Sequence, residues 1–267
     1  MPDVSLVFFA QMLVLGAAVG VLSNALGIGG GLLMVPAFVE FAPGMDQHTA
    51  KGTSLFIITF VALINTWRLN RGVTNIEWRL TGWLAAGSVA GAYAGAWSTA
   101  LLPERAVTWI FVIVLALVAL RLAFGDPHEP ERPSQRPKPG MAIAIGLATG
   151  IISGATGVGG GAIMVPLVLL AAVASHKRVV AISNMVMVMT CLAATAAHAQ
   201  AEATTDLPWT WGQVNLALAP LIVAGAQAGG PAGRWINHHL TRARRRQAMF
   251  ALLAIIAARL TYRAITG

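Results

Sequence analysis

The sequence predicts an all-α polytopic membrane protein made of two inverted-topology repeats, each with a glycine-broken or re-entrant helix hairpin and three transmembrane helices. Three observations indicate this fold class. Of the 267 residues, 57% are hydrophobic and only 10% are charged, and the apolar residues fall in long blocks. A glycine-rich motif occurs twice along the chain. Basic residues concentrate in particular loops, as they do in the cytoplasmic loops of membrane proteins.

The apolar blocks are long enough to cross a bilayer as helices. The blocks from Ala106 to Phe124 and from Val179 to Ala197 contain no acidic residue. At about 1.5 Å rise per residue, blocks of this length approach the ~30 Å thickness of the hydrocarbon core. The expected helical segments lie at about residues 6–26, 32–42, 51–68, 79–101, 105–124, 141–155, 162–174, 178–198, 213–235 and 245–264.

An internal repeat divides these segments into two halves of five. The stretch from Ser23 to Pro36 reads SNALGIGGGLLMVP, and it returns from Ser153 to Pro166 as SGATGVGGGAIMVP. We therefore expect an N-terminal membrane repeat at 1–124 and a C-terminal inverted repeat at 140–267. Residues 125–139, with five prolines among charges, form a cytoplasmic linker. Further along, Gly87, Gly91, Gly95 and Trp97 recur as Gly225, Gly229, Gly233 and Trp235.

Loop charges predict that the two halves have opposite orientations. The loop after the third segment carries Arg68, Arg71 and Arg79 in the first half, whereas its counterpart carries Glu202 and Asp206 and no base. Five passes per half, an odd number, would produce this contrast, because cytoplasmic loops are enriched in Lys and Arg. With both termini outside the cytoplasm, the basic residues left on the extracytoplasmic side are only Lys51, Arg105, Arg259 and Arg263.

The two glycine clusters are the predicted binding site. The segments at 32–42 and 162–174 are too short to cross a bilayer alone. Glycines at four-residue spacing, as on 87–95, are explained by helix packing, but three consecutive glycines do not line one helix face. Each cluster instead precedes a new helix, whose unpaired N–H groups and positive dipole end attract anions. Two inverted copies would bring these ends together near the midplane.

Candidate substrate-binding residues lie in the clusters, at the polar positions beside them and early in the third segment of each half. Each Ser or Thr hydroxyl could instead bond to a helix carbonyl one turn back, so both roles stay open. Lys51 is the candidate electrostatic lure for an anion. The predicted substrate-binding residues are Ser23, Asn24, Gly27, Gly29, Gly30, Gly31, Thr53, Ser54, Ser153, Thr156, Gly157, Gly159, Gly160, Gly161, Ser183 and Asn184.

Several other function classes are not supported by the sequence. Asp and Glu are missing from the middle of every expected segment, which argues against a carboxylate proton relay. Cys191 is the only cysteine, so no intrachain disulfide or thiolate metal cluster is expected. No pairing of a nucleophile with a base suggests an enzyme, and we expect no cofactor or metal. The net charge of +8 is explained by basic loops rather than by nucleic acid.

The two glycine clusters resemble the signature of a known family. Gly27-Ile-Gly-Gly-Gly31 and Gly157-Val-Gly-Gly-Gly161, each followed by Met-Val-Pro, resemble the repeated signature of the TauE/SafE sulfite exporter family. The resemblance covers both halves. It implies a multi-pass permease of the bacterial inner membrane for sulfite, sulfonates or related organosulfur anions, often acting as an exporter. One departure is Asn24, which stands where the second copy has Gly154, and it implies unequal half-sites.

The expected partners are therefore a small anion and the lipid bilayer, with a homo-oligomer left open. The leading hypothesis is a secondary transporter that works by alternating access. Its alternatives are an anion channel with the same pore lining and a membrane assembly or sensor protein that transports nothing.

Overall fold

A computed structural model describes residues 6–26, 30–70, 77–124, 138–171, 174 and 176–266. Within these residues the chain is almost entirely helical. A short antiparallel hairpin joins α8 to α9 and pairs Thr210 with Asn215 and Trp211 with Val214. The elements are α1 (Leu6–Leu26), α2 (Gly31–Phe41), α3 (Gln47–Asn70), α4 (Trp78–Ala100), α5 (Glu104–Phe124), α6 (Pro139–Thr156), α7 (Gly161–Leu170), α8 (His176–Gln200), β1 (Thr210–Trp211), β2 (Val214–Asn215), α9 (Leu218–His239) and α10 (Arg242–Thr266).

The predicted segments correspond one by one to these helices, and the ends differ by a few residues. The largest difference is at the start of α9, predicted at residue 213 and found at Leu218. Here Asn215 is buried in the hairpin, and its side-chain oxygen accepts a hydrogen bond from the Leu218 N–H at 3.3 Å. Most of the predicted linker, residues 125–137, lies outside the described residues, and Pro139 already begins α6.

Membrane-crossing length and apolarity are found in three of the described helices. These stretches are Gln47–Trp67, Pro139–Thr156 and Ala181–Gln200, in α3, α6 and α8. Shorter apolar stretches occupy parts of α1, α2, α5 and α10. The chain therefore has the helical, multi-pass composition that the sequence predicts.

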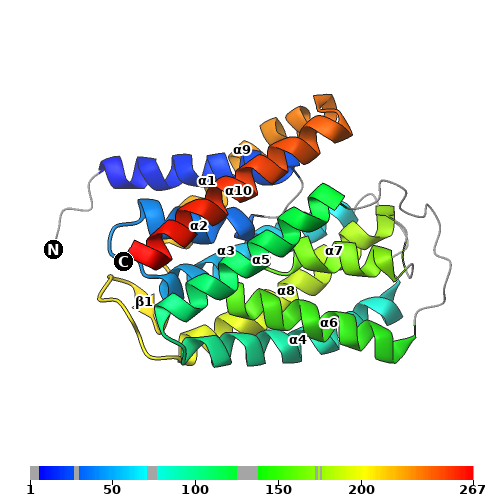
Figure 1. Cartoon of the computed structure of the whole chain (residues 1–267), viewed down its shortest axis with the longest axis horizontal. Coiled ribbons are helices and arrows are strands. Elements are labelled where there is room, and N and C mark those ends of the chain that lie inside the picture. The colour runs from blue at the N-terminus through cyan, green and yellow to red at the C-terminus, as the bar shows by residue number, and fades with distance from the viewer. Residues whose placement is uncertain are drawn as a thin grey trace.

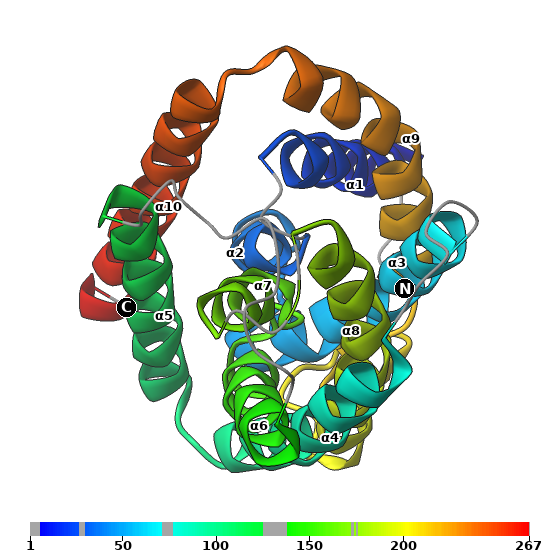
Figure 2. The same cartoon turned by 90° about the vertical axis from the view of Figure 1, so that its right-hand side faces the viewer.

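The two short helices occupy the interior of the molecule. Viewed along the long axis, α2 and α7 lie at the centre, with α1, α9, α10, α5, α6 and α4 around them (Figure 2). Viewed from the side, α2 and α7 extend toward opposite ends of the molecule (Figure 1). Leu32, Val35 and Phe38 of α2 are fully buried. This central position is what brings the glycine clusters into the protein interior.

Glycines at four-residue spacing let α4 pack directly on α6. A Cβ on Gly91 would overlap the carbonyl oxygen of Leu147, and a Cβ on Gly95 would overlap that of Ile151. Residues later in α4 contact residues later in α6, so the two helices run parallel. Small residues allow such close backbone approach between membrane helices. The packing interpretation of these glycines is confirmed.

The same arrangement joins α1 to α9. A Cβ on Gly20 would overlap the carbonyl oxygen of Ala226, and a Cβ on Gly229 would overlap that of Ala17. The first helix of each half thus packs on the fourth helix of the other half. In Figure 1, α5 runs from left to right, whereas its counterpart α10 runs from right to left.

The glycine seams predict that valine substitutions at two glycines of α4 have very different effects on stability. We expect Gly91→Val to destabilise the protein by about 3 kcal/mol or more, because α4 and α6 must separate to admit the side chain. Gly82→Val is the matched control, since a Cβ there meets nothing within 4 Å. Thermal unfolding of both variants in detergent measures the difference. Equal melting temperatures would contradict the proposed seam.

Candidate functional site

The helix is interrupted at the second glycine cluster. Helix α6 ends at Thr156, and the next helix begins at Gly161. Between them, Gly157, Gly159 and Gly160 have φ values of 77°, 83° and 78°. Glycine adopts this left-handed conformation without the steric cost that a side chain imposes. The glycines are thus required by the backbone path that separates α6 from α7.

The first cluster has helix ends at matching positions. Helix α1 ends at Leu26 and α2 begins at Gly31, while Gly27 and Gly29 lie outside the described residues. The Gly30 carbonyl accepts hydrogen bonds from the N–H groups of Leu33 and Met34, at 3.2 and 3.1 Å. The Gly160 carbonyl likewise accepts bonds from the residues three and four positions later, at 3.1 and 2.8 Å. The two short helices therefore begin in the same way.

The two clusters meet in the middle of the molecule. A Cβ on Gly31 would overlap the carbonyl oxygen of Val158, so the start of α2 touches the loop that precedes α7. Ile58 of α3 lies against both Gly31 and Gly159. Two interrupted segments that lie 130 residues apart in the chain are thereby placed next to one another.

A cavity of about 80 Å³, lined by both polar and apolar side chains, lies beside the first cluster, between α1, α2, α3, α8 and α9. A cavity of that size holds a few waters, for which about 10–15 Å³ each suffices, or one small anion. The described residues that line it include no carboxylate. Its polar lining consists of Ser23, Asn24, Asn65, Asn184, Gln227 and Arg234.

Several of these polar side chains have no partner within the protein. In the described part of the chain, Ser23, Asn65, Gln227 and Arg234 make no side-chain hydrogen bond or ion pair. Asn24, in contrast, donates from Nδ2 to the Gly20 carbonyl at 2.8 Å. Ser23, Asn65 and Gln227 are half-buried and Arg234 is exposed, so water can also reach these groups. The unpaired groups here are available to whatever occupies the cavity.

The second cluster is enclosed and has unpaired hydroxyl groups of its own. A Cβ on Gly160 would come within 3.6 Å of Ser153 Oγ, and one on Gly161 within 3.7 Å of Ser183 Oγ. The hydroxyls of Thr149, Ser153 and Ser183 are buried and have no hydrogen-bond partner in the described residues. An unsatisfied buried hydroxyl costs about 1–3 kcal/mol. The start of α7 therefore also lies among groups that could bind an oxygen-bearing ligand.

The other predicted hydroxyls bond to protein groups in this structure. Thr53 Oγ1 accepts a hydrogen bond from the Asn215 N–H at 2.9 Å. Ser54 Oγ donates to the Gly157 carbonyl at 3.0 Å, and Thr156 Oγ1 donates to the carbonyl one turn back at 2.6 Å. These bonds hold the hairpin and the second cluster on α3. A substrate role for these three residues remains a prediction.

The predicted lure, Lys51, is fully buried. Its Nζ donates to Thr99 Oγ1 of α4 at 3.2 Å, and its backbone lies against Gly157. It does not line the polar cavity. Near it, the ring of His198 bonds to Gln213 Oε1 at 2.8 Å and contacts the Gly154 carbonyl at 3.3 Å. This buried polar network fixes the hairpin to the ends of α6 and α8.

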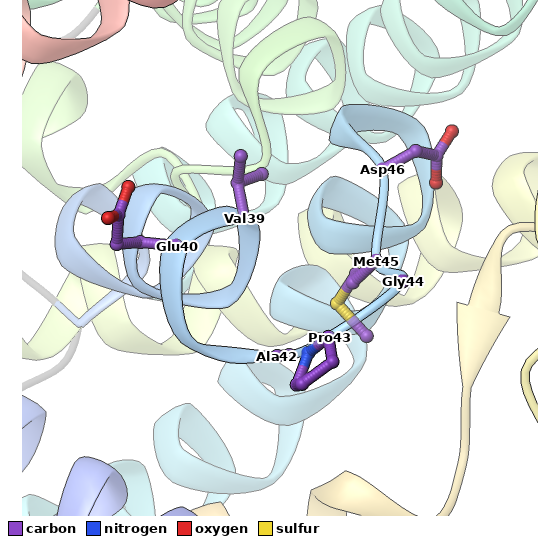
Figure 3. Close-up of a pocket in the computed structure, with 7 residues that line it drawn as sticks. All are labelled: Val39, Glu40, Ala42, Pro43, Gly44, Met45 and Asp46. Carbon is purple, nitrogen blue, oxygen red and sulfur yellow. The ribbon is translucent and has the colours of Figure 1, made fainter.

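A larger, open hollow lies elsewhere, at the turn between α2 and α3. Figure 3 shows its lining, in which the carboxylates of Glu40 and Asp46 project away from the turn. Its volume is about 520 Å³. Glu40 forms an ion pair with Arg259 of α10, and Asp46 accepts a bond from the Thr49 N–H at 3.0 Å. The negative charges make this hollow a poor anion site, so the cavity beside Gly30 is the better candidate.

Comparison with known proteins places the chain in a family. The family model described as sulfite exporter TauE/SafE matches residues 12–260. The chain belongs to the TauE/SafE family. The matched residues include both halves of the chain and both glycine clusters. No solved structure matches the chain.

Relatives of this TauE/SafE protein are named as membrane transporters. The "probable membrane transporter protein YunE" of Bacillus subtilis is 26% identical, over 96% of this chain and 98% of its own. A "probable membrane transporter protein" of Methanocaldococcus jannaschii is also 26% identical, over 94% of both chains. One from Haemophilus influenzae is 29% identical over 59% of both. Together with the family membership, these relatives identify the chain as a multi-pass membrane transporter.

Sequence reasoning missed three residues of the cavity in this TauE/SafE protein. Asn65 and Gln227 are polar residues within apolar segments, a signal that could have selected them. Arg234 lies near the end of α9. From sequence alone, a basic residue at this position is explained by the enrichment of Lys and Arg on the cytoplasmic side. Only the packing of α9 on α1 shows that its side chain lines the cavity.

Proposed function

We propose that this transporter exports a small anion, such as sulfite, a sulfonate or a related organosulfur compound, by alternating access. The site would be formed where the start of α2 meets the loop that precedes α7. The observation that carries the proposal is the contact of Gly31 with Val158, beside a cavity whose described lining contains no carboxylate. Helix starts present unpaired N–H groups and a positive dipole end, both of which favour anions.

The proposal includes two repeats of opposite orientation in the bacterial inner membrane, with both termini extracytoplasmic. The opposite directions of α5 and α10 support this (Figure 1). The reciprocal seams, α4 on α6 and α1 on α9, are what two equivalent halves would form. Broken helices that meet at the repeat interface are typical of secondary transporters with inverted repeats. On this topology, Arg234 lies toward the cytoplasm, the side from which an exporter collects its substrate.

Flux in proteoliposomes tests the proposed activity. We expect saturable uptake or exchange of radiolabelled sulfite or a sulfonate, because a carrier must change conformation in every cycle. An ohmic current that does not saturate would support the channel alternative and exclude alternating access. Absence of flux for every anion tested would exclude both and favour a non-transporting membrane protein.

Cysteine labelling tests the position of the site. The only native cysteine, Cys191, is fully buried, so an introduced thiol can be labelled with little background. We expect Ser23→Cys to react with a small maleimide and to be protected by a transported anion, because Ser23 lines the cavity. Thr210→Cys, on the hairpin outside the cavity, serves as the control that the anion should not protect. Equal labelling of both variants with and without the anion would contradict the proposed position.

A further inference from the structure

The polar lining of the cavity is repeated only in part at the second glycine cluster: Ser153, Thr195 and Ser54 stand at the positions of Ser23, Asn65 and Asn184. The repeat places Ala96 at the position of Arg234, and Val89 at the position of Gln227. The corresponding helices α4 and α6 pack on one another through a glycine seam, as α9 and α1 do. The guanidinium of Arg234 and the carboxamide of Gln227 are therefore found in one half-site and not in the other.

Helical spacing directs these side chains into the cavity. On α9, Gln227, Gly230 and Arg234 occupy positions i, i+3 and i+7, which form one helix face. The neighbouring Gly229 packs on α1, so the same helix carries a packing face and a cavity face. Asn65 reaches the cavity from α3. The polar groups thus come from rigid helices, which fixes their relative positions.

The charge of the lining limits the charge of the ligand. Arg234 is the one ionic side chain among the described residues that line the cavity. A singly charged anion is neutralised by one guanidinium, whereas a doubly charged anion keeps an unpaired negative charge. Arg234 is itself exposed, so solvent screens part of this difference. The carboxamides of Asn65 and Gln227 add neutral N–H donors, and each also offers a carbonyl acceptor.

We propose that this cavity selects singly charged oxyanions over doubly charged ones. Arg234 supplies the neutralising cation, and Asn65 and Gln227 supply hydrogen bonds. Their carbonyl groups favour a ligand with an O–H or N–H group of its own. This inference rests on the proposed function, because it assigns the substrate class of the same transporter.

Calorimetric titration of the protein in lipid nanodiscs tests the selectivity. The probes are methanesulfonate and sulfamate, which carry one charge, and sulfate, which has similar size and carries two. We expect both monoanions to bind at least about tenfold more tightly than sulfate, and Arg234→Gln to weaken methanesulfonate binding by about tenfold, as for an exposed charge-assisted contact. Arg244→Gln, an equal charge change on α10 outside the cavity, should leave binding unchanged.

A second variant tests the same idea by gain of function. Gln227→Lys adds a second cation to the lining, and we expect it to raise sulfate binding relative to methanesulfonate by about tenfold. Equal binding of sulfate and methanesulfonate by the unmodified protein would overturn the inference, and so would an unchanged preference in both variants. In either case, anion transport itself would stand. If no anion binds and none crosses the membrane, the proposed function fails instead.

Discussion

Replacing Gly160 with valine should reduce substrate flux by about two orders of magnitude, because displacing binding groups by about 1 Å can cost that much. Gly160 has a φ of 78°, which a β-branched residue adopts only under strain of about 1–3 kcal/mol. The new side chain would also press on Thr149, whose methyl carbon lies 3.2 Å from the expected Cβ. The start of α7 must therefore shift. Radiolabelled flux in proteoliposomes measures the effect.

The same variant should still insert into the membrane, since the strain is small compared with the burial of several apolar helices. Gly140→Val, on the same half of the chain, meets nothing within 4 Å and is the control. Gly30→Val should reduce flux less than Gly160→Val does, because Gly30 has an ordinary φ of −64° and its nearest neighbour is the flexible end of Met34. Normal flux by Gly160→Val would remove the second cluster from the transport site.

Most of the helical architecture could be predicted from sequence because glycine and proline mark the ends of apolar blocks. The break before Gly161 follows from consecutive glycines, which permit positive φ. The hairpin at Thr210–Asn215 was missed, since each strand has only two residues and lies next to an apolar segment. Its position depends on distant contacts, such as that of Asn215 with Thr53, which no local pattern reveals. The exact limits of the two repeats as domains stay a prediction.

The candidate site was predictable only in part, for a physical reason. Ser23, Asn24 and Gly30 lie in the repeated motif and Asn184 lies early in the third segment of its half, which is why the sequence predicts them, and all four line the cavity. Ser153 and Ser183 lie at the enclosed second cluster, with unpaired hydroxyl groups. The cavity combines residues of five helices, and single-sequence periodicity does not show which helix faces meet. The difference between the two half-sites is therefore seen only in the structure, where α9 packs on α1.

Filling the cavity should also stop transport. We expect Asn65→Trp to reduce flux at least tenfold, because an indole is far larger than the carboxamide it replaces in a cavity of about 80 Å³. Leu63→Trp is the matched control: it lies two residues away on α3, and its side chain is 53% exposed on the outer surface of the protein. Trp is well tolerated at membrane-facing positions near an interface. Both variants are compared for flux after their melting temperatures have been measured.

The comparison separates a blocked path from a damaged fold. If Asn65→Trp melts like the unmodified protein and carries no flux, the anion must pass through or bind in this cavity. If both tryptophan variants transport normally, the path lies elsewhere, and the enclosed cluster around Gly160, with the hydroxyls of Thr149, Ser153 and Ser183, becomes the site to test. A tryptophan at position 65 should also prevent Ser23→Cys from reacting with maleimide, since the two residues line the same space. That second readout does not depend on knowing the substrate, and it therefore tests the cavity directly.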